Sequence, residues 1–175
     1  MLETNRDYKF NSKQSTPNVR VRPYMKPYHR KSTLEDVVKL KDNLRYEDKR
    51  EVETLGHTPE HALGYAYLSS TICRSIMNNY DQVVGMYGVV PVTESEISGI
   101  VWMLGSDGLL KIKTSFLKES RTEVEGMNKL FPHLCNLIDS RNEVHLKWIK
   151  WCGFKIIGEK MFNNVKFFEF CKVAR

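Results

Sequence analysis

The chain has no long apolar run and no excess of glycine or proline. No apolar stretch approaches the roughly 18 residues that a membrane-spanning helix needs. Residues 1–13 have no apolar core of the kind found in secretory signals, so we expect a protein that is not secreted. With 10 Gly and 6 Pro in 175 residues, a collagen-like or low-complexity chain is excluded. The length and the 41% of hydrophobic residues predict one domain with its own core.

Clustered cysteines are also absent. The four cysteines are scattered, at Cys73, Cys135, Cys152 and Cys171. No two have the CxxC spacing, and no Cys/His cluster has zinc-finger spacing, so the sequence predicts no metal site. In a chain that can build its own core, such cysteines are typical small buried residues rather than disulfide partners. We therefore expect a reducing compartment.

Positive charge is concentrated near the start of the chain. Residues 1–30 hold seven basic and two acidic residues, a net charge of +5 out of +6 for the whole chain. The same segment has three Pro and three Tyr and shows little periodicity, apart from an alternation at 18–22 that allows a short strand. We expect residues 1–30 to be an extended arm that becomes ordered against a partner, and residues 31–175 to be the folded domain. A protein in a larger assembly and a nucleic acid are the two candidate partners.

The first part of the domain has a helical period. An apolar stripe begins after Thr33 and ends by Gly56, with Leu34, Val37, Val38, Leu40 and Leu44 as its members. Thr58, followed by Pro59 and Glu60, predicts a second helix, with Thr58 as its N-cap, that runs to about Asn78.

Strand patterns follow. Valine-rich residues 82–90 and the apolar run at 97–104 predict a hairpin. We then expect a helix at 115–131, a strand at 133–138, a helix at 141–152 and two closing strands at 154–157 and 165–173, joined by a turn at 158–164. Gly153 lies between a helix and a strand, which predicts a positive φ. This order predicts a mixed α/β fold in which helices flank a single sheet.

The most distinctive segment runs from Asp139 to Phe154. Its Asn142 near a helix start and its Gly153-Phe154 exit resemble a segment of the GNAT acetyltransferase superfamily, and the element order over about 33–173 resembles the same fold. A closer resemblance is to the acetyltransferase-like proteins of short-tailed bacteriophages, which include proteins named internal virion protein A. It rests on Ile100-Val-Trp102-Met-Leu-Gly105-Ser-Asp107-Gly, Arg121, Asp139-x-Arg141-Asn142-x-Val-His145, and Trp148-x-x-Trp151-x-Gly153-Phe154.

The resemblance implies an acetyl-CoA-dependent N-acyltransferase in the host cytoplasm or in the virion. It implies that the pantetheine arm of coenzyme A passes between Leu104 and Asn142. It also implies that the pyrophosphate lies near Lys111, Lys113 and Ser115, although the glycine spacing that active members use there is missing. Two lysines in a solvated loop are the alternative.

The catalytic residues are not identified by the resemblance. Ile149 stands at the position where the family commonly has a Tyr that acts as the general acid, and Ile cannot donate a proton. His145 is the candidate proton acceptor, with a packed helix position as the alternative. Two functions therefore stay open: the acyltransferase, and a non-catalytic virion or assembly protein that keeps the fold and docks through residues 1–30. Binding of acetyl-CoA discriminates between them.

Overall fold

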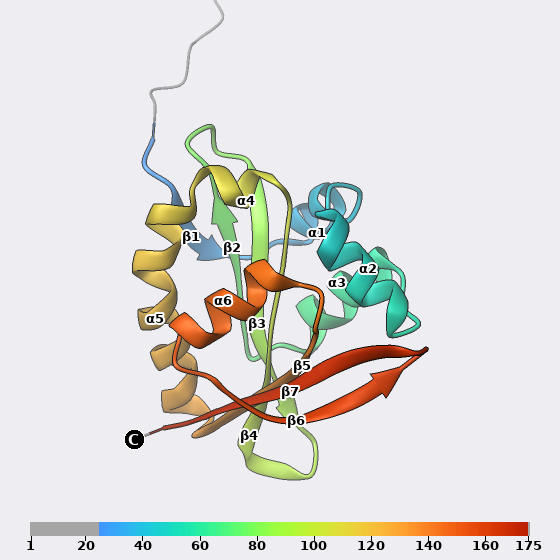
Figure 1. Ribbon diagram of the computed structural model, residues 1–175. Helices are drawn as coiled ribbons and strands as arrows, with labels where there is room; N and C mark the ends of the chain where they lie inside the picture. Colours follow the sequence, from blue (N-terminus) through green and yellow to red (C-terminus); the bar gives the residue numbers. More distant parts are fainter. Residues whose placement is uncertain (1–24, 175) are drawn as a thin grey trace, which may run out of the picture.

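The computed structural model describes residues 25–174 (Figure 1). Seven strands and six helices follow one another in that range. In chain order they are β1 (Tyr28–Lys31), α1 (Leu34–Lys41), α2 (Tyr46–Thr54), α3 (Pro59–Ser69), β2 (Ile72–Met77), β3 (Val83–Val92), β4 (Ser95–Gly105), α4 (Gly108–Lys111), α5 (Lys113–Leu130), β5 (His133–Asp139), α6 (Glu143–Trp151), β6 (Lys155–Phe162) and β7 (Val165–Val173). No helix of the described range is both long and apolar enough to cross a membrane.

All seven strands form one mixed sheet, in the order β1-β2-β3-β4-β5-β7-β6. Every neighbouring pair is antiparallel except β4 and β5, which are parallel. The predicted mixed sheet flanked by helices is confirmed. The predicted pairing of β3 with β4 and the place of the closing hairpin at the far edge are confirmed as well.

Strands β4 and β5 separate along their length. They are paired over only three positions, from Ser98 with His133 to Ile100 with Cys135. Just beyond, the Asn136 side-chain amide donates to the Val101 carbonyl at 2.8 Å. After that point the two strands continue apart, so the sheet is split between the carboxyl end of β4 and that of β5. We call this region the split.

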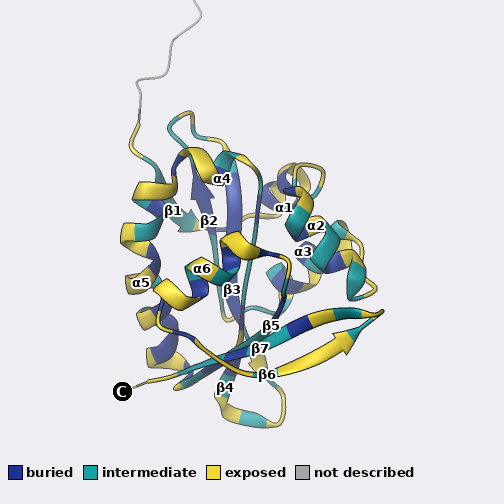
Figure 2. Cartoon of the chain, in the orientation of Figure 1, coloured by how far each residue is buried: buried dark blue, intermediate teal, exposed yellow. Residues whose placement is uncertain are grey.

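Helices cover both faces of the sheet (Figure 2). One core cluster joins α5 and α6 to the sheet through Val124, Met127 and Ile149, among others. A second cluster joins α1 and α3 to β3, with Leu40, Leu63 and Met86 fully or nearly fully buried. The split is therefore flanked by α1–α3 on one face and by α5 and α6 on the other.

Several predicted boundaries are wrong. The helix that begins at Pro59 ends at Ser69 rather than at Asn78, because residues 72–77 form β2, hydrogen-bonded between β1 and β3. The first helical stripe is divided into α1 and α2, with 42–45 between them. The fifth helix begins at Lys113, and β6 extends to Phe162, which leaves only Asn163 and Asn164 in the turn, both with positive φ.

The sheet begins inside the segment that we assigned to the basic arm. Tyr28–Lys31 pairs with β2, and the Arg30 guanidinium binds both carboxylate oxygens of Asp36 at 2.7 Å. The alternation at 18–22 lies outside the described residues. Gly153 has a φ of 86°, as predicted, and all four cysteines are free thiols.

Candidate functional site

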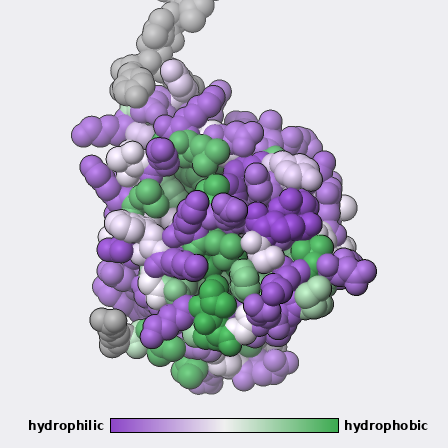
Figure 3. All heavy atoms as spheres, viewed as in Figure 1, coloured by the Kyte–Doolittle hydropathy of each residue, from purple (hydrophilic) through white to green (hydrophobic). Residues whose placement is uncertain are grey.

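The split encloses a cavity of about 160 Å³. Its walls are mostly apolar and come from both faces of the sheet. They include Val52 and Ala66 from α2 and α3, Met103 and Leu104 from β4, Leu137 and Ile138 from β5, and Trp148 and Ile149 from α6. In the view of Figure 3, apolar residues gather in the middle of this face, where α6 meets the closing strands. The cavity therefore connects the two faces of the sheet through the gap between β4 and β5.

The main chain of β4 is open toward this cavity at one position. Alternate residues of a strand direct their N–H and C=O groups to the same side. The groups of Val101 and Gly105 are directed toward the β5 side, since Val101 accepts from Asn136 and Gly105 bonds to Arg45 and Asp48 at the start of α2. Met103 lies between them, so its N–H and C=O groups are directed into the split.

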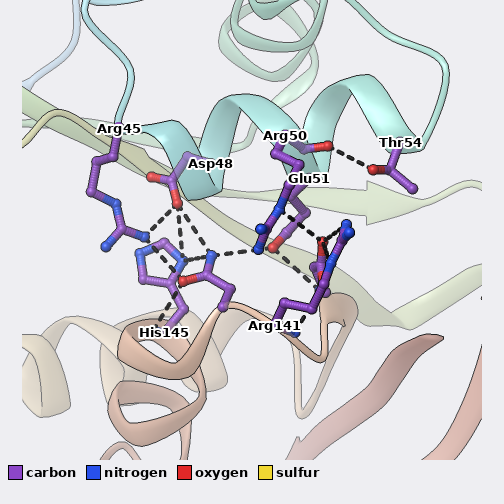
Figure 4. A network of polar contacts seen from close by, with 9 residues as sticks. Arg45, Asp48, Arg50, Glu51, Thr54, Arg141 and His145 are labelled. Carbon is purple, nitrogen blue, oxygen red and sulfur yellow. Dashed lines mark hydrogen bonds and ion pairs between the residues drawn. The ribbon is translucent and has the colours of Figure 1, made fainter. Parts of the chain in front are cut away.

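Polar side chains close one end of the split, where β4 ends at Gly105 and α6 begins after Asn142 (Figure 4). We call this the outer end and the cavity side the inner end. The Asp48 carboxylate accepts from the Gly105 N–H at 2.8 Å, and the Arg45 N–H donates to the Gly105 carbonyl at 2.9 Å. The Arg45 guanidinium and Asp48 form an ion pair, and each is at most 2% exposed. Figure 4 shows both side chains pointing toward His145. Asp48 and Arg45 thus use both main-chain groups of the last residue of β4.

Asn142 is the N-cap of α6 and is completely buried. Its Oδ1 accepts from the His145 N–H at 3.4 Å and from the Arg45 guanidinium at 3.2 Å. Its Nδ2 donates to Asp48 and Glu51, at 3.3 and 3.2 Å. The structure thus places Leu104 and Asn142 on opposite sides of the split. The amide of Asn142, however, is fully used inside the protein.

Glu51 is the one carboxyl of this cluster that lines the cavity. Its Oε2 accepts from Asn142 and, at 3.3 Å, from the Asp139 N–H. Burial, and then the nearby charge of Asp48, raises the pKa of Glu51 from 4.5 to about 7. A carboxyl with such a pKa exchanges protons near neutral pH, which is what a general base requires.

Sequence reasoning missed Glu51 and Asp48 because α2 is short and polar. Only two of its nine residues, Asp48 and Val52, are buried. The i, i+4 spacing of these two marks one face, but a single sequence does not distinguish a buried Asp from a solvated one. Arg50 extends the contacts of α2, with its Nε 3.7 Å from the Asp139 carboxylate at the end of β5.

His145 lies inside the network rather than at the surface. Its Nδ1 is 3.6 Å from an Asp48 oxygen, and its Nε2 has no hydrogen-bond partner among the described residues. Burial lowers the pKa of His145 to about 4, so the imidazole is neutral at physiological pH. A neutral imidazole can accept a proton, but a pKa this low makes His145 a weaker base than Glu51.

The residues predicted to hold a pyrophosphate lie after β4. Lys111 ends α4, Lys113 begins α5, and both are exposed, while Ser115 is partly exposed in the first turn of α5. The main-chain N–H groups of the turn before these residues already have hydrogen-bond partners. Ser106 N–H donates to the Val84 carbonyl, and the N–H groups of residues 108–110 bond within the turn.

Packing accounts for the glycines of this turn. A Cβ on Gly108 would lie 2.5 Å from a Val84 side-chain carbon, and one on Gly105 would lie 3.0 Å from Leu109. These glycines let the turn lie close to β3, so their presence does not indicate an anion cradle. Nor does any group of three or more His, Cys, Asp or Glu in residues 25–174 have the arrangement of a metal site.

Comparison with known proteins identifies the fold. No family model and no curated protein matches the sequence. Solved structures do match. An acetyltransferase of the GNAT family from Streptococcus pneumoniae has a TM-score of 0.59 at 12% identity, over 86% of this chain and all of that one. Ribosomal-protein-S5-alanine acetyltransferase from Vibrio fischeri gives 0.59 at 14% identity, over 86% and 94%.

A third structure, the Bacillus subtilis acetyltransferase in complex with CoA, has a TM-score of 0.57 at 12% identity, over 86% of this chain and 99% of that one. All three similarities extend over 86% of this chain. The chain has the GNAT fold.

The two ends of the split offer different groups to a ligand such as coenzyme A. The inner end offers an apolar cavity, the open main chain of Met103 and the Glu51 carboxyl. At the outer end, the path between Leu104 and Asn142 is bridged by Asp48, which bonds to both Gly105 and Asn142. Ile149 lines the cavity and offers no proton donor.

Proposed function

We propose that this protein is an acyl-CoA-dependent N-acyltransferase in which Glu51 is the general base. The observation that carries the proposal is a half-buried carboxyl, with a pKa of about 7, in the wall of a cavity inside the split of a GNAT fold. Coenzyme A would supply the acyl group as a thioester. Acetyl-CoA is the first donor to test, because relatives in fold are acetyltransferases.

The residues of the chain have separate roles in this proposal. The apolar walls exclude water from the acyl group, and the Met103 N–H and C=O groups offer main-chain hydrogen bonds to an extended ligand. Glu51 would accept the proton that an acceptor amine loses as its nitrogen attacks the acyl carbon; the C–S bond of the thioester breaks, and coenzyme A leaves as a thiolate that takes a proton from solvent. Lys111 and Lys113 attract phosphate groups of the donor at the surface.

The test uses purified protein, acetyl-CoA and a panel of amines that includes peptide N-termini and polyamines. Release of free thiol and the mass of the acylated product are measured together. Replacing Glu51 with Gln should lower kcat about 100-fold or more, the usual contribution of a general base. Glu53→Gln is the matched control, because Glu53 lies on the same helix and is exposed. Equal rates in the two variants would contradict the role of Glu51.

A non-catalytic role is the second candidate, and one observation favours it. The closure of the outer end by Asp48 is what a fold that has lost its cofactor would be expected to have. In that case we propose an internal virion or assembly protein of a phage that docks through its basic residues 1–30, with protein or nucleic acid as partner. Absence of any acetyl-CoA binding, together with retention of the protein in assembled particles, would support this candidate.

A further inference from the structure

We infer that Asp48 is a removable occupant of the cofactor path: a CoA-type ligand binds only after the Asp48 carboxylate has left Gly105 and Asn142. This inference rests on the proposed function, and it concerns how the site opens rather than what reaction it performs. Asp48 would act as a latch made from the chain itself.

The geometry places Asp48 between the two walls of the split. Gly105 is the last residue of β4, and Asn142 caps the helix that follows β5. One Asp48 oxygen accepts from the Gly105 N–H at 2.8 Å, and the other accepts from Asn142 Nδ2 at 3.3 Å. A ligand that enters between β4 and α6 must therefore replace Asp48 as the acceptor of these two hydrogen bonds.

The donors that Asp48 holds match the chemistry of the ligand. The Gly105 N–H and the Asn142 amide N–H could donate to a carbonyl oxygen in place of the carboxylate, and pantetheine carries amide carbonyls. Arg45 would lose the one ion-pair partner that it has within residues 25–174, and a buried guanidinium without an anion is costly. A phosphate of the ligand can replace that anion. A ligand with both amides and phosphates therefore satisfies all three donors.

Polar contacts, rather than apolar packing, hold the latch closed. Asp48 and Val52 are the only buried residues of α2, so the first turn of the helix has no apolar anchor of its own. The Arg45 Nε lacks a hydrogen-bond partner among the described residues, so the closed state leaves part of the buried ion pair unsatisfied. Opening the first turn breaks polar contacts, whereas Val52 and the Glu51 carboxyl can stay in place.

The test compares Asp48→Asn with wild type and with Glu53→Gln, a control on the exposed side of the same helix. The Asn amide places N–H groups against the donors of Arg45 and Asn142, which weakens the closed state without removing volume. Calorimetric titration with CoA should show at least tenfold tighter binding for Asp48→Asn, and no change for Glu53→Gln. In wild type, CoA should speed the hydrogen exchange of the Arg45 amide, which the closed state bonds to the Gly105 carbonyl.

Each outcome separates the latch from the proposed function. If wild type binds CoA as tightly as Asp48→Asn, and the Arg45 amide stays protected in the complex, the latch is wrong and the acyltransferase proposal stands. If neither protein binds CoA while both are folded by circular dichroism, the acyltransferase proposal is wrong and the latch has no ligand to admit. Should Asp48→Asn fail to fold, the exchange measurement on wild type decides.

Discussion

The pKa values of Glu51 and His145 are shifted in opposite directions, so the pH dependence of stability tests the polar network around them. The pKa of Glu51 is raised from 4.5 to about 7 and that of His145 is lowered from 6.5 to about 4, in both cases mainly by burial. Between pH 4.5 and 7, folded Glu51 keeps a proton that the unfolded chain has released, so stability falls as pH rises. Between pH 4 and 6.5, folded His145 lacks a proton that the unfolded chain has bound, so stability rises with pH.

The two slopes cancel in wild type over the range that they share. Each group changes the free energy of unfolding by about 1.4 kcal/mol per pH unit, with opposite signs, between pH 4.5 and 6.5. Replacing Glu51 with Gln leaves the slope of His145 uncompensated. The variant should therefore lose up to about 3 kcal/mol of stability on acidification from pH 6.5 to 4.5, relative to wild type. Because Glu51 is partly exposed, solvent screening makes this figure an upper bound.

Urea unfolding at pH 4.5, 5.5, 6.5 and 8 measures the difference directly. The Gln side chain keeps an oxygen that accepts from Asn142 and the Asp139 N–H, so the contacts of Glu51 are conserved apart from its charge. Glu53→Gln is again the control, and its profile should run parallel to that of wild type. A Glu51→Gln profile parallel to wild type between pH 4.5 and 6.5 would refute the assignment of a shifted pKa to Glu51.

Three further predictions concern the rest of the chain. Gly153→Ala should destabilise the protein by about 1 kcal/mol, because φ is 86° at this position even though a Cβ would have space. Gly126→Ala, at a helix position with open space around it, should stabilise the protein slightly. Thermal unfolding measures both changes. Replacing Lys111 and Lys113 with Ala should weaken CoA binding, with the largest loss at low salt, and an effect independent of salt would contradict their role. Deleting residues 1–30 should lower the melting temperature more than deleting 1–24 does, because the longer deletion removes most of β1; equal melting temperatures would show that β1 contributes no stability.

Local sequence signals predicted the parts of the fold that carry their own period or cap. The Thr58-Pro59 start of α3 and the Gly153 exit of α6 are found where the sequence placed them. Strand β2 was missed because the apolar residues Ile72 and Ile76 suit the face of a helix as well as they suit a strand. Hydrogen bonding to β1 and β3 decides between the two, and β1 is distant from β2 in the sequence.

The site could be predicted only in part, because a sequence pattern marks some of its residues and not others. Leu104 and Asn142 were found through the resemblance, and the fold brings them to one split. Asp48 and Glu51 come from a short polar helix, and their burial depends on the contacts that α2 makes with β4 and α6. Those contacts also connect the two proposals, since the charge of Asp48 contributes to the raised pKa of Glu51. If a ligand displaces Asp48, the charge of Asp48 no longer raises the pKa of Glu51, while burial, the larger cause, still raises it. Opening of the cofactor path would then also act on the protonation of the base.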